Sequence, residues 1–537
     1  MTQKAVTDAL ASKADASVLA TKADVSALAA KADKSYVDQQ IAAIPTGTGN
    51  GTTVVTGEVN LGAENAGKMV VVNTTGGLRS SDLTEEALAE LLIKSGNYQA
   101  EGAVGLTSDF ENKAFERTQE ASGKTAGSDF DQYPMFGGRM RCNVADDGTI
   151  TAFYGDANYK EDGSNGQVMV YQPKFYYQRI PLKMESSNVG KIIRKESLMI
   201  SAVPHSGFKL HPLFETADHN VLEYVLLPAY DGCAYDVSAS AYILDDGAGV
   251  DLVNDKLSSI AGAKPISGVN HSFTIADAEK MATNRGAGWH ITNMAAESAN
   301  QMLEIVEFGM FNGQAALEGG IVNIPSTPND VNCSAISGST ANLGNSTGHA
   351  SITTIEINGT TTEYTTAGKR AISYRGVENP WGNIWHFLGG IIVNGNSANG
   401  GGIPYICNGF NYSPSTLTEN YISIGFNLPA NQSWISAMGY GSTQYDWIYM
   451  PAECSEYANS ASPIGDIIWT TNNLNGNRIA LVGGMWTSGT NGGPFYYGCD
   501  RTADSYFNSY SARLMYIPTK NAIHDTNYQA WLAKFGA

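Results

Sequence analysis

The sequence predicts an α+β protein: one large domain rich in strands and loops, preceded by a helical stalk and a small β-rich collar. Glycine contributes 58 of the 537 residues, and charged residues only 16%, against about 25% in a typical globular chain. Helical periodicity is confined to a few segments. Elsewhere, short apolar runs alternate with loops of Gly, Asn and Ser, which is typical of strands.

Residues 1–44 are predicted to be a helical stalk or attachment segment. The triplet Lys-Ala-Asp begins at Lys13, Lys22 and Lys31, so the repeat has a nine-residue step. Abundant alanine favours helix, but nine residues at roughly 100° each place successive repeats on opposite sides of a straight helix. Such a helix has too little apolar surface to be stable alone. We therefore expect it to associate with copies of itself, most simply in a homotrimer.

Residues 45–97 are predicted to be a small β-rich collar with one short helix. Proline and glycine after residue 44 end the helical pattern. Two alternating segments, residues 53–61 and 68–75, are predicted to pair as a hairpin. Residues 84–96 are the predicted helix, which begins at a threonine N-cap, has two glutamates in its first turn and ends at a glycine.

Residues 98–537 are predicted to form one α+β domain. Strands are expected within residues 166–180, 191–203 and 221–230. Two helices are expected over 274–286 and 292–313, where Thr274 and Thr292 occupy the N-cap positions. After about residue 320 the pattern consists almost entirely of short strands and polar loops. We therefore expect long loops on a compact scaffold.

Charge and cysteine content argue against several classes of function. The net charge is −19 without a Lys/Arg cluster, which disfavours nucleic-acid binding. The first residues lack the apolar segment of a signal peptide, and no apolar run approaches the roughly 18 residues of a membrane span. The six cysteines lack the paired spacing of a zinc site, so we expect isolated buried thiols and neither a metal nor a cofactor.

Residues 487–513 have the composition of a binding loop. This segment contains six aromatic rings but no Leu, Ile, Val or Met, and it lies between two apolar runs. Tyr and Phe provide large contact areas with few rotatable bonds, as they do in antibody paratopes. The residues predicted to contact a receptor are Phe495, Tyr496, Tyr497, Asp500, Arg501, Asp504, Tyr506, Phe507, Asn508 and Tyr510, with Trp486 as the buried edge of the patch. The alternative is that the rings fill the core of a loop-rich domain, and for the similar stretch Trp434–Tyr449 that alternative is favoured.

Three segments occur in the order found in a known family: residues 288–314, 375–390 and 481–518. Together they resemble the C-type-lectin-like domain of phage tail-fibre receptor-binding proteins. More narrowly, they resemble the variable proteins diversified by retroelements, of the major tropism determinant type. The resemblance implies a virion protein made in the cytoplasm of a bacterial host. It would attach to the phage tail or baseplate through its N-terminus and bind a bacterial surface receptor, protein or glycan.

The same resemblance implies a variable region at 486–513, because this family mutates adenines in codons of the AAY type. Such mutation cannot yield Lys, Glu, Gln, Met or Trp, and residues 487–513 contain none of these. Calcium-dependent sugar binding is not implied, because residues 377–381 carry Glu-Asn-Pro in place of the Glu-Pro-Asn of lectins. Five residues are expected to pack the turn that supports the loop: Arg375, Trp381, Asn383, Trp385 and His386.

Two other functions stay open on the sequence alone. A surface-glycan depolymerase would need two carboxylates across a sugar bond, and Asp500 with Asp504, or Asp245 with Asp246, would supply them. A structural fibre subunit without receptor binding is the other, although it would gain nothing from an aromatic-polar loop. His205, His211 and His219 recur at near-regular spacing, but without clustered partners packing is favoured over metal binding.

Overall fold

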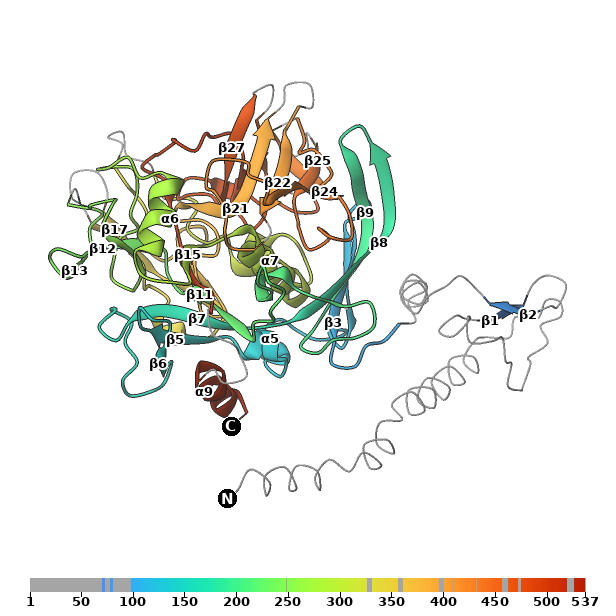
Figure 1. The fold of residues 1–537 in the computed structure, drawn as a ribbon, viewed down its shortest axis with the longest axis horizontal. Coiled ribbons are helices and arrows are strands. Elements are labelled where there is room, and N and C mark those ends of the chain that lie inside the picture. Colours follow the sequence, from blue (N-terminus) through green and yellow to red (C-terminus); the bar gives the residue numbers. More distant parts are fainter. Residues whose placement is uncertain are drawn as a thin grey trace, which may run out of the picture. The chain divides into compact units, whose positions relative to one another are not determined.

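The computed structural model describes residues 70–72, 78–80, 98–247, 249–325, 331–355, 361–395, 400–407, 409–430, 432–455, 462–471, 475–518 and 526–536 (Figure 1). The stalk predicted over 1–44, the collar strand predicted over 53–61 and the helix predicted over 84–96 lie outside these residues. The chain divides into two compact units, residues 1–82 and 83–537.

In the first unit, two short strands pair. β1 (Val70–Val72) is antiparallel to β2 (Leu78–Ser80), with Val71 opposite Arg79. The strand expected within residues 68–75 is therefore confirmed over three residues. Its described partner follows it in the chain, whereas the partner predicted from the sequence precedes it.

The second unit consists mostly of β-sheet with few helices among its described residues, which agrees with the predicted α+β class. Among the described residues, the first of three large sheets is organised around a long hairpin, residues 176–201, whose second strand pairs with a further strand at each of its ends. In spatial order its strands are β10 (Lys209–Leu210), β8 (Tyr176–Ser187), β9 (Gly190–Ser201), β24 (Trp434–Tyr440) and β25 (Pro451–Ser455), with β3 (Val104–Asp109) and β4 (Ala114–Gln119) beside β9.

The other two large sheets both receive strands from the end of the domain. The second sheet contains, in order, β15 (Trp289–Ile291), β30 (Leu514–Tyr516), β11 (Tyr224–Pro228), β7 (Gln167–Pro173), β5 (Met140–Val144) and β6 (Ile150–Phe153). The third contains β23 (Tyr421–Ser423), β22 (Ile403–Cys407), β21 (Trp385–Gly395), β27 (Gly476–Val482), β28 (Tyr497–Gly498) and β26 (Ile468–Trp469), with β29 (Tyr510–Ser511) against β21.

Small sheets form within the segments that connect the strands of the large sheets. One joins β12 (Gly232–Asp236), β13 (Ala241–Ile243) and β14 (Lys256–Ser259), and another joins β16 (Gly348–Ala350), β19 (Ala371–Tyr374) and β20 (Val377–Glu378). The third pairs β17 (Ile352–Ile355) with β18 (Thr361–Tyr364).

Both predicted helices are confirmed, but they end at Thr283 and Phe308, before the predicted limits of 286 and 313. α6 (Ile275–Thr283) begins after Thr274, whose hydroxyl accepts the N–H of Asp277 in a reciprocal capping box. α7 (Met294–Phe308) begins after Asn293, whose side chain accepts the N–H of Ala296 at 2.9 Å. The N-cap predicted at Thr292 is thus one residue early, because the N–H of Thr292 still donates to the carbonyl of Arg513 at 2.8 Å.

The other α-helices among the described residues are shorter or lie near residue 537: α5 (Pro134–Gly137), α8 (Gly313–Leu317) and α9 (Thr526–Phe535). Helix α9 covers part of the second sheet, where Trp531 stacks on Tyr171 at 5.1 Å and donates to the carbonyl of Gly138 at 2.8 Å (Figure 1). Of the helices in the described part of the chain, none combines the length and apolarity needed to cross a membrane.

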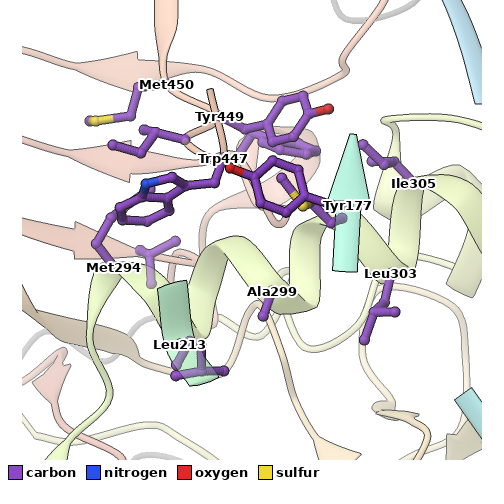
Figure 2. Close-up of a cluster of buried hydrophobic side chains, with 14 of the residues drawn as sticks. Tyr177, Leu213, Met294, Ala299, Leu303, Ile305, Trp447, Tyr449 and Met450 are labelled. Carbon is purple, nitrogen blue, oxygen red and sulfur yellow. The ribbon is translucent and has the colours of Figure 1, made fainter. Parts of the chain in front are cut away.

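Helix α7 packs inside the largest hydrophobic core (Figure 2). Its Met294, Ala299, Leu303 and Ile305 belong to the same buried cluster as Trp447. Within the stretch Trp434–Tyr449, four aromatic side chains are buried: Tyr440, Tyr445, Trp447 and Tyr449. The prediction that these rings are core is therefore confirmed for four of them, whereas Trp434 is half-buried against a second hydrophobic cluster.

Candidate functional site

Residues 487–513 run from the core to the surface and back. The segment follows β27, contributes β28 and β29 to the third sheet, and leads into β30 of the second sheet. β28 is antiparallel to β27, whereas β29 is parallel to β21, with Tyr510 opposite Trp385. Between the two short strands lies the segment that we call the 500–508 surface loop, residues 500–508.

Four rings predicted to face a receptor are buried, so the expectation that they face solvent is wrong. Phe495 and Tyr497 have no exposed surface, and Tyr496 and Tyr510 retain 5% and 7%. Residues 492–499 are buried without interruption. The composition of this half of the segment therefore reflects packing, and its rings belong to the scaffold beneath the loop.

Phe495 and Tyr497 are buried because they pack beside α7. The ring centroid of Phe495 lies 5.3 Å from that of Phe311, which follows the helix. The hydroxyl of Tyr497 accepts the side-chain N–H of Gln301 at 2.7 Å and donates to the carbonyl of Tyr449 at 3.2 Å. The buried hydroxyl is therefore satisfied, which lets a tyrosine replace an aliphatic residue in this core.

Tyr496 and Tyr510 belong to a different hydrophobic cluster from Phe495 and Tyr497, and they pack against β21. The ring of Tyr496 lies 4.4 Å from that of Trp385, and the ring of Tyr510 lies 5.9 Å from that of Phe387. Burial raises the pKa of both tyrosines to about 12, so both hydroxyls stay neutral over the physiological range.

Trp486 is buried as predicted, with 2% of its surface exposed. It packs in a separate cluster with Ile321, Ile324 and Ile384. Its backbone N–H donates to the carbonyl of Asn383 at 3.0 Å, and its own carbonyl accepts from Ile324 at 2.6 Å. Trp486 therefore fixes the point at which the segment leaves β27.

The remaining predicted residues reach solvent from the 500–508 surface loop. They comprise Tyr506 (47% exposed), Phe507 (44% exposed), the exposed Arg501 and Asp504, and the half-buried Asp500 and Asn508. The Arg501 guanidinium lies 5.3 Å from the centre of the Phe507 ring, and its Nε lies 3.4 Å from a carboxylate oxygen of Asp500. The hydroxyl of Thr502 donates to the Asp504 carboxylate, which lowers the pKa of that carboxyl. The loop thus presents two rings, one cation and two carboxylates.

Hydrogen bonds from distant segments hold the loop in place. The carbonyl of Arg501 accepts the N–H of Ile479 at 2.9 Å, and the carbonyl of Phe507 accepts the N–H of Gly268 at 2.9 Å. The side-chain amide of Asn508 donates to the carbonyl of Val331 at 3.1 Å. A Cβ at position 268 would lie only 2.8 Å from the backbone nitrogen of Phe507, so this close approach requires glycine.

Asp246 joins two of the supporting segments from beneath. Its carboxylate accepts the backbone N–H of Ser267 at 2.9 Å and the side-chain N–H of Asn332 at 2.9 Å. These residues adjoin Gly268 and Val331, which hold the loop. The sequence suggested Asp246 only as half of a carboxylate pair. The structure instead gives it a positioning role that no local pattern indicates.

Trp469 is an exposed aromatic residue that sequence reasoning missed. It ends β26 with 39% of its surface exposed, and its indole N–H donates to the hydroxyl of Tyr496 at 2.7 Å. Its carbonyl accepts the N–H of Cys499 at 2.7 Å, which places it beside the start of the 500–508 surface loop. The available signal was the alternation of buried Ile468 with exposed Trp469, which spans too few residues to be recognised.

No family model matches this chain, and no curated protein matches it. Among solved structures, it is similar to the P3c and U1 variants of Major Tropism Determinant. Each is 13% identical, the alignment covers 75% of this chain and 77% of the other, and the TM-score is 0.25. A TM-score of this size does not establish a shared fold. The C-type-lectin-like fold therefore stays a prediction.

The turn expected to support the loop is buried as predicted: Arg375, Trp381, Asn383, Trp385 and His386 each expose 7% of their surface or less. Of the three regularly spaced histidines, His211 is fully buried among aromatic rings, and burial lowers its pKa to about 3. Packing therefore accounts for His211. Within the described ranges, no group of three His, Cys, Asp or Glu side chains is arranged to hold a metal ion.

The cysteines are mostly buried thiols, as predicted. Five are buried and Cys454 is half-buried, and none of the six forms a disulfide. Burial raises the pKa of Cys454 to about 12, so it is protonated and unreactive at neutral pH. The thiols therefore serve packing and add no chemistry to the 500–508 surface loop.

Proposed function

We propose that this chain is a phage tail-fibre protein or adhesin that binds a bacterial surface receptor through the 500–508 surface loop. The observation that carries the proposal is the exposure of two adjacent rings, Tyr506 (47%) and Phe507 (44%), on a loop that is hydrogen-bonded to distant segments. Rings held in this way provide contact area at low conformational cost. The ordered motifs in the sequence support a role in host attachment.

The proposed contact surface is smaller than the set predicted from the sequence. It retains Asp500, Arg501, Asp504, Tyr506, Phe507 and Asn508, and gains Trp469 and Val331, which are 39% and 42% exposed. The five buried aromatic residues Trp486, Phe495, Tyr496, Tyr497 and Tyr510 support this surface. With a net charge of −19, the chain disfavours polyanionic receptors at long range.

We also propose that the chain works as a homotrimer in the virion, attached to the tail or baseplate through its N-terminal residues. Binding sites that act together raise the overall affinity well above that of a single site. A weak contact at each 500–508 surface loop would then still give firm adsorption to the cell.

The double substitution Tyr506→Ser and Phe507→Ser is expected to reduce binding of the labelled chain to host cells at least about tenfold, because aromatic anchors often contribute roughly 2 kcal/mol each. The melting temperature should change little, since about half of each side chain is exposed and neither belongs to a buried core cluster. Tyr154→Ser is a matched control, because Tyr154 is 38% exposed and belongs to a different part of the chain. Unchanged binding by the folded double variant would place the receptor site elsewhere.

Incubation with host capsule or lipopolysaccharide is expected to release no new reducing ends. A glycosidase requires one carboxyl whose pKa is raised so that it serves as a general acid. The pKa of Asp504 is instead lowered by its hydrogen bond from Thr502, and Asp246 is held by structural hydrogen bonds. Sugar release that disappears in Asp500→Asn or Asp504→Asn would establish the depolymerase alternative.

A further inference from the structure

A small cavity lies inside the domain where α7 meets the third sheet and the two ends of the segment 492–513. Its volume is ≈ 20 Å³, enough to hold about one water molecule. Polar side chains line it from two elements: Glu297, Asn300 and Glu304 from α7, and His386 from β21. Pro494 and Arg513 also line it, so it lies at the base of the segment that carries the 500–508 surface loop.

Burial favours the neutral form of the two carboxyl groups at this cavity. Burial raises the pKa of Glu297 to about 8, although Arg513 acts in the opposite direction. Burial also raises the pKa of Glu304 well above its ordinary value, and the nearby Glu297 adds to this shift. Glu304 leaves one carboxyl oxygen, Oε2, without a hydrogen-bond partner inside the protein. A protonated carboxyl both donates and accepts, so each glutamate suits a neutral polar ligand.

His386 contributes a hydrogen-bond acceptor to the same site. Its Nε2 lies 2.9 Å from a carboxylate oxygen of Asp231. Burial acts to raise the pKa of Asp231, but Arg513, His386 and Asn383 outweigh it, so the carboxyl is ionised. Burial lowers the pKa of His386. The neutral ring therefore keeps its proton on Nε2, facing Asp231, and leaves Nδ1 as an acceptor.

Charged ligands do not fit this set of side chains. The terminal nitrogens of Arg513 already donate to the carbonyls of Asn379 and Glu378, both at 2.7 Å, and NH1 lies 3.2 Å from Asp231. The charge of Arg513 is therefore already paired, and its Nε, which has no hydrogen-bond partner inside the protein, is a further donor for a neutral ligand. Among the described residues, no metal-binding group of three His, Cys, Asp or Glu side chains exists, which disfavours a cation. A small neutral molecule that donates and accepts hydrogen bonds fits best.

We propose that this cavity binds one ordered water molecule, hydrogen-bonded by α7 through Glu297, Asn300 and Glu304 and by β21 through His386. The water connects the helix to the third sheet at the base of the segment that carries the 500–508 surface loop. It also gives buried polar groups a partner that the protein itself does not supply. The proposal is independent of receptor binding.

A high-resolution crystal structure of the full chain tests the proposal directly. We expect one density peak in the cavity, refined as water, within about 2.7–3.2 Å of at least two of the four side chains. Crystals soaked in rubidium or bromide salts should show no anomalous signal there. An empty cavity, or an anomalous peak that reveals an ion, would overturn the proposal.

The substitution Glu297→Gln tests the neutral state of the site in solution. Glutamine mimics the protonated carboxyl but cannot ionise. In the wild type, the stabilisation from the bound proton is complete below the unfolded-state pKa near 4.5 and is lost as the pH rises through about 8. Other titratable groups facing Glu297 are Glu304, His386, Arg513 and Tyr497. Because Glu297 contributes to the raised pKa of Glu304, its replacement also reduces that shift, which changes the pH dependence in the same direction.

The melting temperature of Glu297→Gln, relative to wild type, should therefore rise by roughly 2 °C or more between pH 5 and pH 8.5. Glu116→Gln removes an exposed carboxyl of β4 and should show no such pH-dependent difference. A Glu297→Gln difference that is the same at both pH values would contradict a protonated Glu297 and, with it, the neutral water site.

Discussion

Phe495→Ala is expected to lower the free energy of unfolding by roughly 3–5 kcal/mol, the range for removing a buried aromatic ring. The side chain has no exposed surface, and its ring centroid lies 5.3 Å from Phe311 and 6.3 Å from Tyr449. Its backbone N–H also donates to Asp466 at 2.8 Å, which restrains the backbone from relaxing into the space that the missing ring would leave. Denaturant unfolding of the domain, followed by tryptophan fluorescence, measures the change.

Phe507→Ala is the matched control, because it removes the same ring from the same segment. Phe507 is 44% exposed and packs mainly on Tyr510 and Arg501. We expect it to change the unfolding free energy by less than about 1 kcal/mol while weakening cell binding. Equal, small changes in stability for both variants would mean that Phe495 also faces solvent, and the original assignment of the segment to a binding surface would stand.

This contrast explains why the sequence alone could not divide residues 487–513 into core and surface. Phe495 and Phe507 lie in the same aromatic, glycine-rich composition, and the segment contributes only the two-residue strands β28 and β29. A period of two cannot be recognised over two residues. Burial is decided instead by partners far away in sequence, such as Phe311 for Phe495 and Trp385 for Tyr496.

The two main helices could be predicted because their signals are local. Thr274 and Asp277 form a capping box within four residues, and the buried residues of α7 recur at helical spacing. Support for the 500–508 surface loop has no local signal. Gly268 donates to the carbonyl of Phe507, and Asp246 accepts a buried hydrogen bond from Asn332. In both cases the partner is more than 80 residues away in the sequence. Such residues become identifiable only once the fold brings the segments together.

The ion pair between Arg375 and Glu307 fixes the end of α7 to the turn that supports the third sheet. Two parallel hydrogen bonds of 2.7 Å join the guanidinium to the carboxylate. Arg375 is 4% exposed and Glu307 is fully buried. The Glu307 carboxylate also accepts the N–H of Gly127 at 2.9 Å, and Arg375 reaches the Asp131 carboxylate at 2.9 Å. The pair thus connects three segments of the domain.

Arg375→Met is expected to lower the unfolding free energy by roughly 3–5 kcal/mol, because it leaves the buried Glu307 carboxylate without its cation. Adding Glu307→Gln should restore at least about 1 kcal/mol, since the amide removes the unpaired charge and still accepts from Gly127. Asp131→Asn should change stability by less than about 1 kcal/mol, because 60% of the Asp131 side chain is exposed. Denaturant unfolding of the wild type, the single variants Arg375→Met and Glu307→Gln, and the variant with both substitutions forms a double-mutant cycle. If Glu307→Gln instead added its own cost to that of Arg375→Met, the destabilisation would come from lost packing, and the buried charge would not be its cause.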